Sequence, residues 1–565
     1  REDVRQRLRE MCDEVIDGEG PPHRLVILLG PAGVGKSRTA EWLCEVVHEE
    51  GTMVPLRARY RKVPSSLDGM MGAVNYYLNF ERADRDTIER SLMSRWGIKA
   101  SDKKGCTWVA GVAEWLRPAQ NSAEAPVGPS GIRFTLDTLE TRRLVIRYAL
   151  KRIARDRPLL FWLDDLHYAP AHTIEGLTRL LAEEPNLRIA MVATVRSEDV
   201  NIDPDATERL RQLRESLDGE VISIKALDSD TTAALVRASL PLDSDAASEA
   251  VRRSRGNPLF ALQQLHAWAL AGNLEFVDGV YRVPPSVLAV RPQTTADLWD
   301  SRVEGVRAEH RLAAYAVAAL GSDVRRSVMV PLLRAVGLQP HEAIVSLQNA
   351  EIILPRGPGR YTFPHALLQE HLLGRLRERP DAKRVFAAAA EALTGHPLAN
   401  TRRLIRLRVT NLLAAGQPDD AAELLFQFLQ QAWNGAREPI ATLADLEFLR
   451  GHLTGRSLAL RHRWQAEALR HVGRSDDAVA HVEIARKIFL EVGDQESYAH
   501  TLRQLGHLAS ERGSSAEGLT LVRQGLEIFA RMDHTLGMAQ SEATAGEIEY
   551  LLGNYESARG CAQRA

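Results

Sequence analysis

The chain has 565 residues, and its 72 lysines and arginines nearly balance its 74 aspartates and glutamates. The length predicts several domains, and the charge balance leaves no overall field that would attract DNA, RNA or an anionic membrane. No apolar run reaches the roughly 18 residues of a membrane span, and the charged N-terminal segment is unlike a signal peptide, so we expect a cytoplasmic protein.

The cysteines indicate the redox compartment of the protein, and the two ends of the chain bear on its full length. The cysteines, Cys12, Cys44, Cys106 and Cys561, show neither paired nor metal-ligand spacing, which is typical of buried thiols in a reducing compartment. The chain has no initiator Met, and it stops within a segment that resembles a repeat helix. We therefore expect a longer protein, with an effector domain outside this chain.

The first 225 residues alternate short apolar runs with helix-length segments. The runs lie at residues 25–29, 53–56, 159–163, 189–195 and 221–224. This alternation is typical of a parallel sheet flanked by helices, so we predict an α/β core over residues 1–225. An insertion at about residues 60–130 contains Trp96, Trp108 and Trp115, which we expect to form a small packed subdomain without chemistry of its own.

A glycine-rich octet follows the first predicted strand and precedes a predicted helix. It matches the P-loop pattern in the strand-to-helix context that the pattern requires. Backbone N–H groups of such a loop surround phosphate oxygens, and the helix N-terminus adds partial positive charge. We expect Lys36 to bridge the β and γ phosphates as a catalytic residue and Ser37 to bind Mg²⁺. The predicted nucleotide-binding residues of this segment are Gly30, Pro31, Ala32, Gly33, Val34, Gly35, Lys36, Ser37 and Arg38.

Charged side chains follow two later predicted strands. Asp164 and Asp165 come directly after a buried apolar run, and Arg196 follows the next run. Ligands bind at the carboxyl ends of the strands in open α/β sheets. We therefore expect Asp164 to hold Mg²⁺, Asp165 to act as general base on the attacking water and Arg196 to sense the γ phosphate.

Two of these roles have a structural alternative. Asp165 would in that case only cap the next helix, and Arg196 would be a surface arginine paired with Glu198 or Asp199. The sequence leaves both alternatives open, and neither affects the P-loop.

The last hundred residues repeat with a period of 40 residues, marked by Gly473, Gly513 and Gly553. Small residues recur at the same period at Ala466, Gly506 and Gly546, at Ala478, Gly518 and Ala558, and at Ala485, Gly525 and Ala565. Each unit predicts a helix, a glycine turn and a second helix, and stacked units form a superhelix. The pattern resembles the tetratricopeptide repeat, although a period longer than the usual length of about 34 residues implies a longer loop.

Several segments together resemble the STAND class of AAA-related ATPases, the signal transduction ATPases with numerous domains. They are GPAGVGKS, LLFWLDDLHYAP, MVATVRSED, GNPLF at residues 256–260 and FPH at residues 363–365. The most similar branch joins such a module to tetratricopeptide repeats. The resemblance implies adenine as the base, Pro258 packed on that adenine, and His365 in contact with the β phosphate of ADP.

The resemblance also divides the rest of the chain. It implies a helical lid at residues 226–290, a winged-helix domain at residues 291–378, a helical linker at residues 379–455 and a TPR-like superhelix at residues 456–565. Within the lid, Asp278-Gly279 is a turn signal that predicts a hairpin.

Two departures from the STAND class bear on activity. The segment between Lys36 and Asp164 is long for this class, and Asp165 stands where glutamate is the commoner general base. We therefore expect slow ATP hydrolysis.

These expectations describe a regulatory ATPase that binds ATP or ADP with Mg²⁺. ADP would hold a closed monomer, and a protein or small-molecule ligand on the repeats, together with ATP exchange, would drive homo-oligomerisation. Two other functions remain open. An AAA-type remodelling ATPase would need a pore loop and a trans-acting arginine, neither of which we identify. An ATP-dependent transcription regulator would need a dense basic face in residues 291–378. This segment includes Arg325, Arg326 and Arg334 but has no such face, so we do not expect direct nucleic-acid contact.

Overall fold

The computed structural model describes residues 1–18, 20–61, 69–81, 83–117, 127–134, 136, 139–155, 157–169, 171–200, 204–289, 294–434 and 439–565. The chain divides into two compact units, Arg1–Ala415 and Gly416–Ala565. This division falls within the predicted helical linker. Parts of the predicted insertion, and the predicted boundary between lid and winged helix at residue 290, lie outside the described residues.

Parallel strands form the main sheet of the first unit, in the order β2-β3-β4-β1-β5. The strands are β1 (His23–Gly30), β2 (Val54–Arg59), β3 (Leu159–Asp164), β4 (Ile189–Arg196) and β5 (Glu220–Ser223). β3 and β4 are buried along their whole length, as in a parallel sheet covered on both faces. The predicted α/β core is confirmed, and β4 separates the P-loop strand β1 from the Asp164 strand β3.

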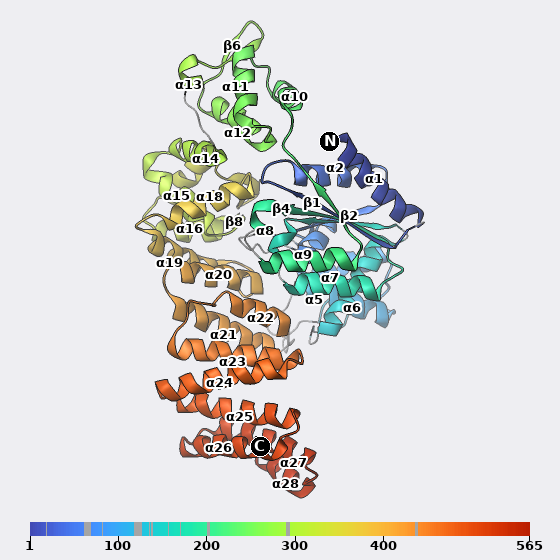
Figure 1. The fold of residues 1–565 in the computed structure, drawn as a ribbon, viewed down its shortest axis with the longest axis vertical. Coiled ribbons are helices and arrows are strands. Elements are labelled where there is room, and N and C mark those ends of the chain that lie inside the picture. Colours follow the sequence, from blue (N-terminus) through green and yellow to red (C-terminus); the bar gives the residue numbers. More distant parts are fainter. Residues whose placement is uncertain are drawn as a thin grey trace. The chain divides into compact units, whose positions relative to one another are not determined.

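Helices lie on both faces of the main sheet (Figure 1). Alternate side chains of the strands enter two separate cores, one on each face. Val26 of β1 packs in a core with side chains of α1 (Glu2–Asp17) and α2 (Lys36–Glu49), whereas Ile27 lies in the core of the opposite face. That second core includes side chains from α3 (Gly69–Tyr77), α4 (Arg85–Trp96), α5 (Lys103–Leu116), α6 (Leu139–Ala154), α7 (Ala171–Glu183) and α9 (Pro204–Ser216).

The tryptophans of the insertion join this second core. Trp115 is buried in it, and Trp96 and Trp108 pack at its edge, where both rings contact Tyr148. The prediction of a separate packed subdomain is therefore wrong, because α4 and α5 bury their apolar faces in the core beneath the sheet.

Helices and a short hairpin follow the sheet. The elements are α10 (Ser229–Ser239), α11 (Ser244–Ser254), α12 (Pro258–Leu270), β6 (Glu275–Val277), β7 (Val280–Arg282) and α13 (Pro285–Ala289), and we call this segment the lid. The helices of the lid pack around a core of their own that contains Trp268. Asp278 and Gly279 both have positive φ angles, 54° and 86°, so the predicted turn joins β6 to β7.

The next part of the first unit combines helices with a small antiparallel sheet, β8-β10-β9. Its elements are α14 (Thr295–Glu304), α15 (Arg311–Ala318), β8 (Asp323–Arg325), α16 (Arg326–Ala335), α17 (Pro340–Asn349), β9 (Leu354–Gly357), β10 (Arg360–Thr362), α18 (Ala366–Arg377), α19 (Ala382–Ala392) and α20 (Arg402–Ala414). They share one core. The assignment of residues 291–378 as a winged-helix domain stays a prediction.

The second unit consists of helices. They are α21 (Pro418–Asn434), α22 (Pro439–Glu447), α23 (Gly455–His471), α24 (Ser475–Val492), α25 (Gln495–Glu511), α26 (Ser515–Arg531), α27 (Thr535–Leu551) and α28 (Tyr555–Arg564). The predicted TPR-like arrangement is confirmed, but the predicted longer loop is wrong. The additional residues extend the helices, since α25, α26 and α27 each have 17 residues and only short turns separate them.

None of the helices within the described ranges combines the length and the apolar composition that crossing a membrane requires.

Candidate nucleotide-binding site

The glycine-rich octet forms the turn between β1 and α2. Gly33 and Gly35 have φ angles of 80° and 100°, which only glycine adopts without strain. The ammonium of Lys36, the first residue of α2, donates to the carbonyls of Gly30 and Pro31, each at 2.7 Å. Burial lowers the pKa of Lys36 to about 8. The loop therefore encloses a desolvated cation at the N-terminus of a helix, an arrangement that suits an anion.

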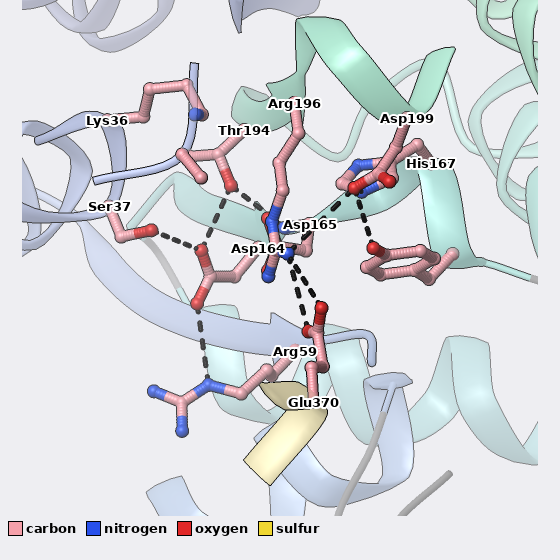
Figure 2. A network of polar contacts seen from close by, with 12 residues as sticks. Lys36, Ser37, Arg59, Asp164, Asp165, His167, Thr194, Arg196, Asp199 and Glu370 are labelled. Carbon is pink, nitrogen blue, oxygen red and sulfur yellow. Dashed lines mark hydrogen bonds and ion pairs between the residues drawn. The ribbon is translucent and has the colours of Figure 1, made fainter. Parts of the chain in front are cut away.

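Asp164 lies beside Ser37, as the sequence predicts. Ser37 Oγ donates to Asp164 Oδ1 at 2.8 Å, and Thr194 Oγ1 of β4 donates to the same oxygen at 2.9 Å (Figure 2). A hydroxyl and a carboxylate suit Mg²⁺, which usually takes one or two protein ligands and completes its shell with water and phosphate oxygens. Groups of three or more potential metal-binding side chains are not found among the described residues.

Two arginines that sequence reasoning missed face the other oxygen of Asp164. Arg57 Nη2 lies 2.7 Å and Arg59 Nε 3.4 Å from Asp164 Oδ2. Burial alone would raise the pKa of this carboxyl group, but the two guanidinium groups lower it to about 2. The guanidinium of Arg57 also lies 3.5 Å from the ring centre of Trp162. Asp164 is therefore ionised throughout the physiological pH range.

Asp165 and Arg196 lie in direct contact. The Arg196 guanidinium donates through Nη2 to Asp165 Oδ2 at 2.9 Å and through Nε to Asp165 Oδ1 at 3.3 Å. Asp165 stands at the N-cap position of the turn Leu166–Tyr168, but its side chain accepts no capping hydrogen bond. The alternative role of Asp165 as a helix cap is therefore not observed.

Arg196 also contacts a carboxylate of α18. Its Nη1 donates to both oxygens of Glu370 at 3.3 Å, and the nearest oxygen of Asp199 lies 3.9 Å away (Figure 2). The side chain of Arg196 is only 8% exposed. The surface pairing that the alternative describes is thus a minor part of a buried network of Asp165, Arg196 and Glu370.

His167 completes the surroundings of this network. Its ring lies 4.0 Å from that of Tyr168, whose hydroxyl donates to Asp199 at 2.7 Å. Burial lowers the pKa of His167. Its Nε2 lies 3.4 Å from Asp199 Oδ2, but neither ring nitrogen makes a hydrogen bond among the described residues, so a neutral imidazole lies close to the acidic pair.

The N-terminus of α12 contacts the P-loop. Asn257 caps the helix by accepting from the backbone N–H of Leu259 and donates its amide to Ala32 O at 3.0 Å. The backbone N–H of Leu259 donates to Gly33 O at 3.3 Å. Pro258 lies between these two residues, so the structure brings it next to the loop. Sequence reasoning singled out Pro258 and missed its neighbours, although a Gly-Asn-Pro capping signal was visible.

His365 lies at the N-terminus of α18 and contacts the lid. Its Nε2 lies 3.1 Å from Nε2 of Gln263, whose carbonyl oxygen accepts from Arg302 Nη2 at 2.8 Å. No described hydrogen bond or ion pair joins His365 to residues 30–37. The structure therefore brings together Lys36, Ser37, Asp164, Asp165, Arg196 and the Pro258 segment, and places His365 against the lid instead.

Comparisons with known proteins agree with this geometry. Residues 1–192 match the family model of the AAA ATPase domain. No curated protein matches the chain. The recognition of an AAA-related P-loop ATPase is confirmed for this N-terminal region.

Solved structures include similar chains of low identity. A STAND protein with a tetratricopeptide repeat sensor from Pyrococcus horikoshii is 11% identical, with a TM-score of 0.38 over 98% of this chain and 81% of that chain. A Cdc6p protein from Pyrobaculum aerophilum is 15% identical, with a TM-score of 0.32 over 67% of this chain and 94% of that chain. BtubC from P. vanneervenii is 15% identical, with a TM-score of 0.22 over 46% and 89% of the two chains.

Proposed function

We propose that this chain is a regulatory ATPase that is closed when it holds ADP and that assembles into homo-oligomers when ATP replaces ADP. A ligand bound by the repeats of the second unit would promote the exchange. The fold, the P-loop and the AAA ATPase match support the ATPase part of this proposal. The winged-helix assignment of residues 291–378 and the positions of the domain boundaries belong to the same proposal.

The residues divide the proposed chemistry between them. The P-loop N–H groups and Lys36 bind the phosphates, and Ser37 and Asp164 hold Mg²⁺, which supplies positive charge to the phosphate oxygens. Asp165 accepts the proton of the attacking water, provided that Arg196 releases it. Pro258 packs on the base. His365 is proposed to contact the nucleotide only in a conformation that differs from the one described above.

The contact between Arg196 and Glu370 carries the switch proposal. Arg196 holds both oxygens of the proposed general base, and Glu370 holds Arg196 from a helix outside the α/β core. While Arg196 occupies both oxygens of Asp165, that carboxylate is not free to accept the proton of the attacking water, so hydrolysis is suppressed while α18 stays in place. Movement of α18 would free Arg196 to meet the γ phosphate.

A switch requires that each nucleotide favours a different conformation, because equal affinity for both would shift nothing. ATP offers Arg196 a γ phosphate that competes with Glu370, whereas ADP does not. The ion pair therefore gives the two nucleotides different effects on the position of α18.

The Glu370→Gln variant tests this proposal. It removes one charge from the contact with Arg196, and we expect it to raise the fraction of oligomer in the presence of a nonhydrolysable ATP analogue by about tenfold, a change of about 1.4 kcal/mol. Size-exclusion chromatography with light scattering measures this fraction.

Glu378→Gln is the matched control, because Glu378 follows the same helix and its side chain is 68% exposed. An equal response of the two variants, or no response of Glu370→Gln, contradicts the proposal. Turnover of many per second that unfolded protein stimulates would instead favour the remodelling ATPase.

A further inference from the structure

The second unit contains two arginines that lack a carboxylate partner. Arg463 of α23 and Arg503 of α25 occupy the same position of successive repeats and are both half-buried. Within the described part of the chain, the guanidinium of Arg463 makes no hydrogen bond or ion pair, and only the backbone carbonyl of this residue accepts, from Gln504 Nε2 at 3.4 Å. Arg503 makes one long hydrogen bond, from Nη1 to Thr544 Oγ1 at 3.5 Å, and its Nε is buried without a partner. Both guanidinium groups therefore keep unused N–H donors.

The other arginines of this unit that are buried or half-buried within the described residues have carboxylate partners, and Arg461, for example, lies 3.6 Å from Glu447. Ion pairs join Arg456 to Asp494, Arg470 to Glu467 and Glu511, Arg486 to Glu483, Arg523 to Glu549, and Arg564 to Glu542. Among the buried and half-buried arginines described in this unit, Arg463 and Arg503 are therefore the two without an ion pair, whereas Arg531 and Arg559, which also lack one, are exposed.

The two arginines without ion pairs lie close enough for the charge of Arg503 to affect the pKa of Arg463. Burial, and then the charge of Arg503, lower the pKa of Arg463. Burial, and then Arg463 and Arg503, lower the pKa of His500 to about 3. The ring of His500 lies 4.7 Å from that of Phe529 and 6.2 Å from that of His534. We call Arg463, Arg503 and His500 the arginine cluster.

Glu467, Asp494 and Glu547 are the acids that act on the charge of the cluster, and none of them forms an ion pair with Arg463 or Arg503 among the described residues. Asp494 is paired with Arg456, and Glu467 is engaged as well. It accepts hydrogen bonds from Arg470 and from Gln504 Nε2, each at 2.9 Å. The two guanidinium groups therefore lie in a partly desolvated place without a carboxylate bound directly to either, which is unfavourable for the unliganded fold. Such an unfavourable arrangement is common where a protein binds a ligand of opposite charge.

We propose that the arginine cluster binds a carboxylate group of the ligand that the repeats sense. This inference rests on the proposed function and names the chemistry of its ligand. Two guanidinium groups present planar pairs of N–H donors that match the two oxygens of a carboxylate. A carboxylate would supply the partner that both guanidinium groups lack, whereas a doubly charged phosphate would be repelled more strongly by Glu467, Asp494 and Glu547. The third repeat has Ala543 at the equivalent position, so the site belongs to the first two repeats.

Calorimetric titration of the 565-residue chain tests the proposal with two probes, a peptide of four glutamates and succinate. We expect a carboxylate probe to bind, and Arg463→Gln and Arg503→Gln each to weaken that binding by about tenfold or more. A peptide of four glutamines should not bind. Binding of the peptide alone identifies an acidic protein segment as the ligand, and binding of succinate identifies a small organic acid.

Three controls accompany the titration. Arg486→Gln makes the same substitution on α24, outside the cluster, and should bind the probes as wild type does. The unfolding temperature of each cluster variant should equal or exceed that of wild type, because the substitution removes one of two like charges. Arg503→Lys keeps the charge and most of the packing, and should bind more tightly than Arg503→Gln.

Lys36→Ala separates this inference from the proposed function. This variant should lose nucleotide binding and keep carboxylate binding, since the P-loop is no part of the cluster. The inference is overturned if neither carboxylate probe binds the folded chain. It is equally overturned if the two cluster variants bind as tightly as wild type or Arg486→Gln.

Discussion

His365 shows how one hydrogen bond fixes a protonation state. Arg302 holds the carbonyl oxygen of Gln263, so the amide NH₂ of Gln263 faces His365 Nε2 and that nitrogen must accept. Burial lowers the pKa of His365, and Arg302 and His266 lower it further. A histidine with a lowered folded-state pKa contributes stability that is present above the unfolded value of about 6.5 and is lost as the pH falls below it.

This gives a pH prediction at the residue scale. Between pH 7 and pH 5.5, wild type should lose more stability than His365→Asn, which has no group to protonate at that position. Thermal unfolding at the two pH values measures the difference. Equal losses in wild type and variant would show that His365 titrates normally and that the contact with Gln263 is absent in solution.

The sequence predicts those site residues whose positions depend on local pattern. The P-loop octet and the acids after β3 are local motifs whose positions at the ends of parallel strands follow from the sequence. Ser37 and Asp164 are accordingly found in contact. Arg57 and Arg59 escape prediction because they reach Asp164 only through the pairing of β2 with β3, which sets Arg59 opposite Asp164. No local sequence motif predicts the order of strands within a parallel sheet.

At the scale of elements, the close approach of α25 and α26 depends on glycine. A Cβ at Gly506 would lie 2.5 Å from the Gly518 carbonyl, and one at Gly518 would lie 2.4 Å from the Gly506 carbonyl. At Gly546, the equivalent position of the next repeat, the nearest atom would be Cys561 Cβ at 3.2 Å. The first two distances are impossible for carbon against oxygen, so the helices would have to separate.

We therefore expect Gly506→Ala to destabilise this helix pair by about 2 kcal/mol, the usual cost of overpacking, and Gly546→Ala by clearly less. Hydrogen exchange followed by mass spectrometry resolves the effect, because protection of α25 and α26 should fall by roughly thirtyfold in the first variant. Similar protection in both variants would mean that the helices do not approach closely at Gly506.

The sequence predicts the period of the repeats correctly. It does not predict that the additional residues of each repeat lengthen the helices instead of a loop. Gly473, Gly513 and Gly553 all have positive φ angles, as their spacing indicates. The extra residues extend the helices because no proline interrupts them and their apolar positions continue. The prediction for the tryptophan-bearing insertion is wrong for a related reason. Apolar composition indicates that Trp115 is buried, but it does not indicate which surface covers this side chain.

At the scale of the whole molecule, we propose that a phosphate site in the first unit works together with a ligand site in the second. The AAA match covers the first 192 residues, and the division of the remaining chain into domains is part of the proposal. Which elements contact each other across domains depends on side chains such as Glu370, and no periodicity of the sequence reveals such contacts. The connection depends first on the P-loop holding a magnesium nucleotide.

Calorimetric titration with ADP and Mg²⁺, for wild type and for Lys36→Ala, tests that claim most directly. We predict binding of one ADP per chain by wild type and at least about a hundredfold weaker binding by the variant, because the buried ammonium is the main positive charge inside the loop. Circular dichroism confirms that both proteins are folded. Absence of ADP binding by folded wild type, or equal affinities of the two proteins, would contradict the account.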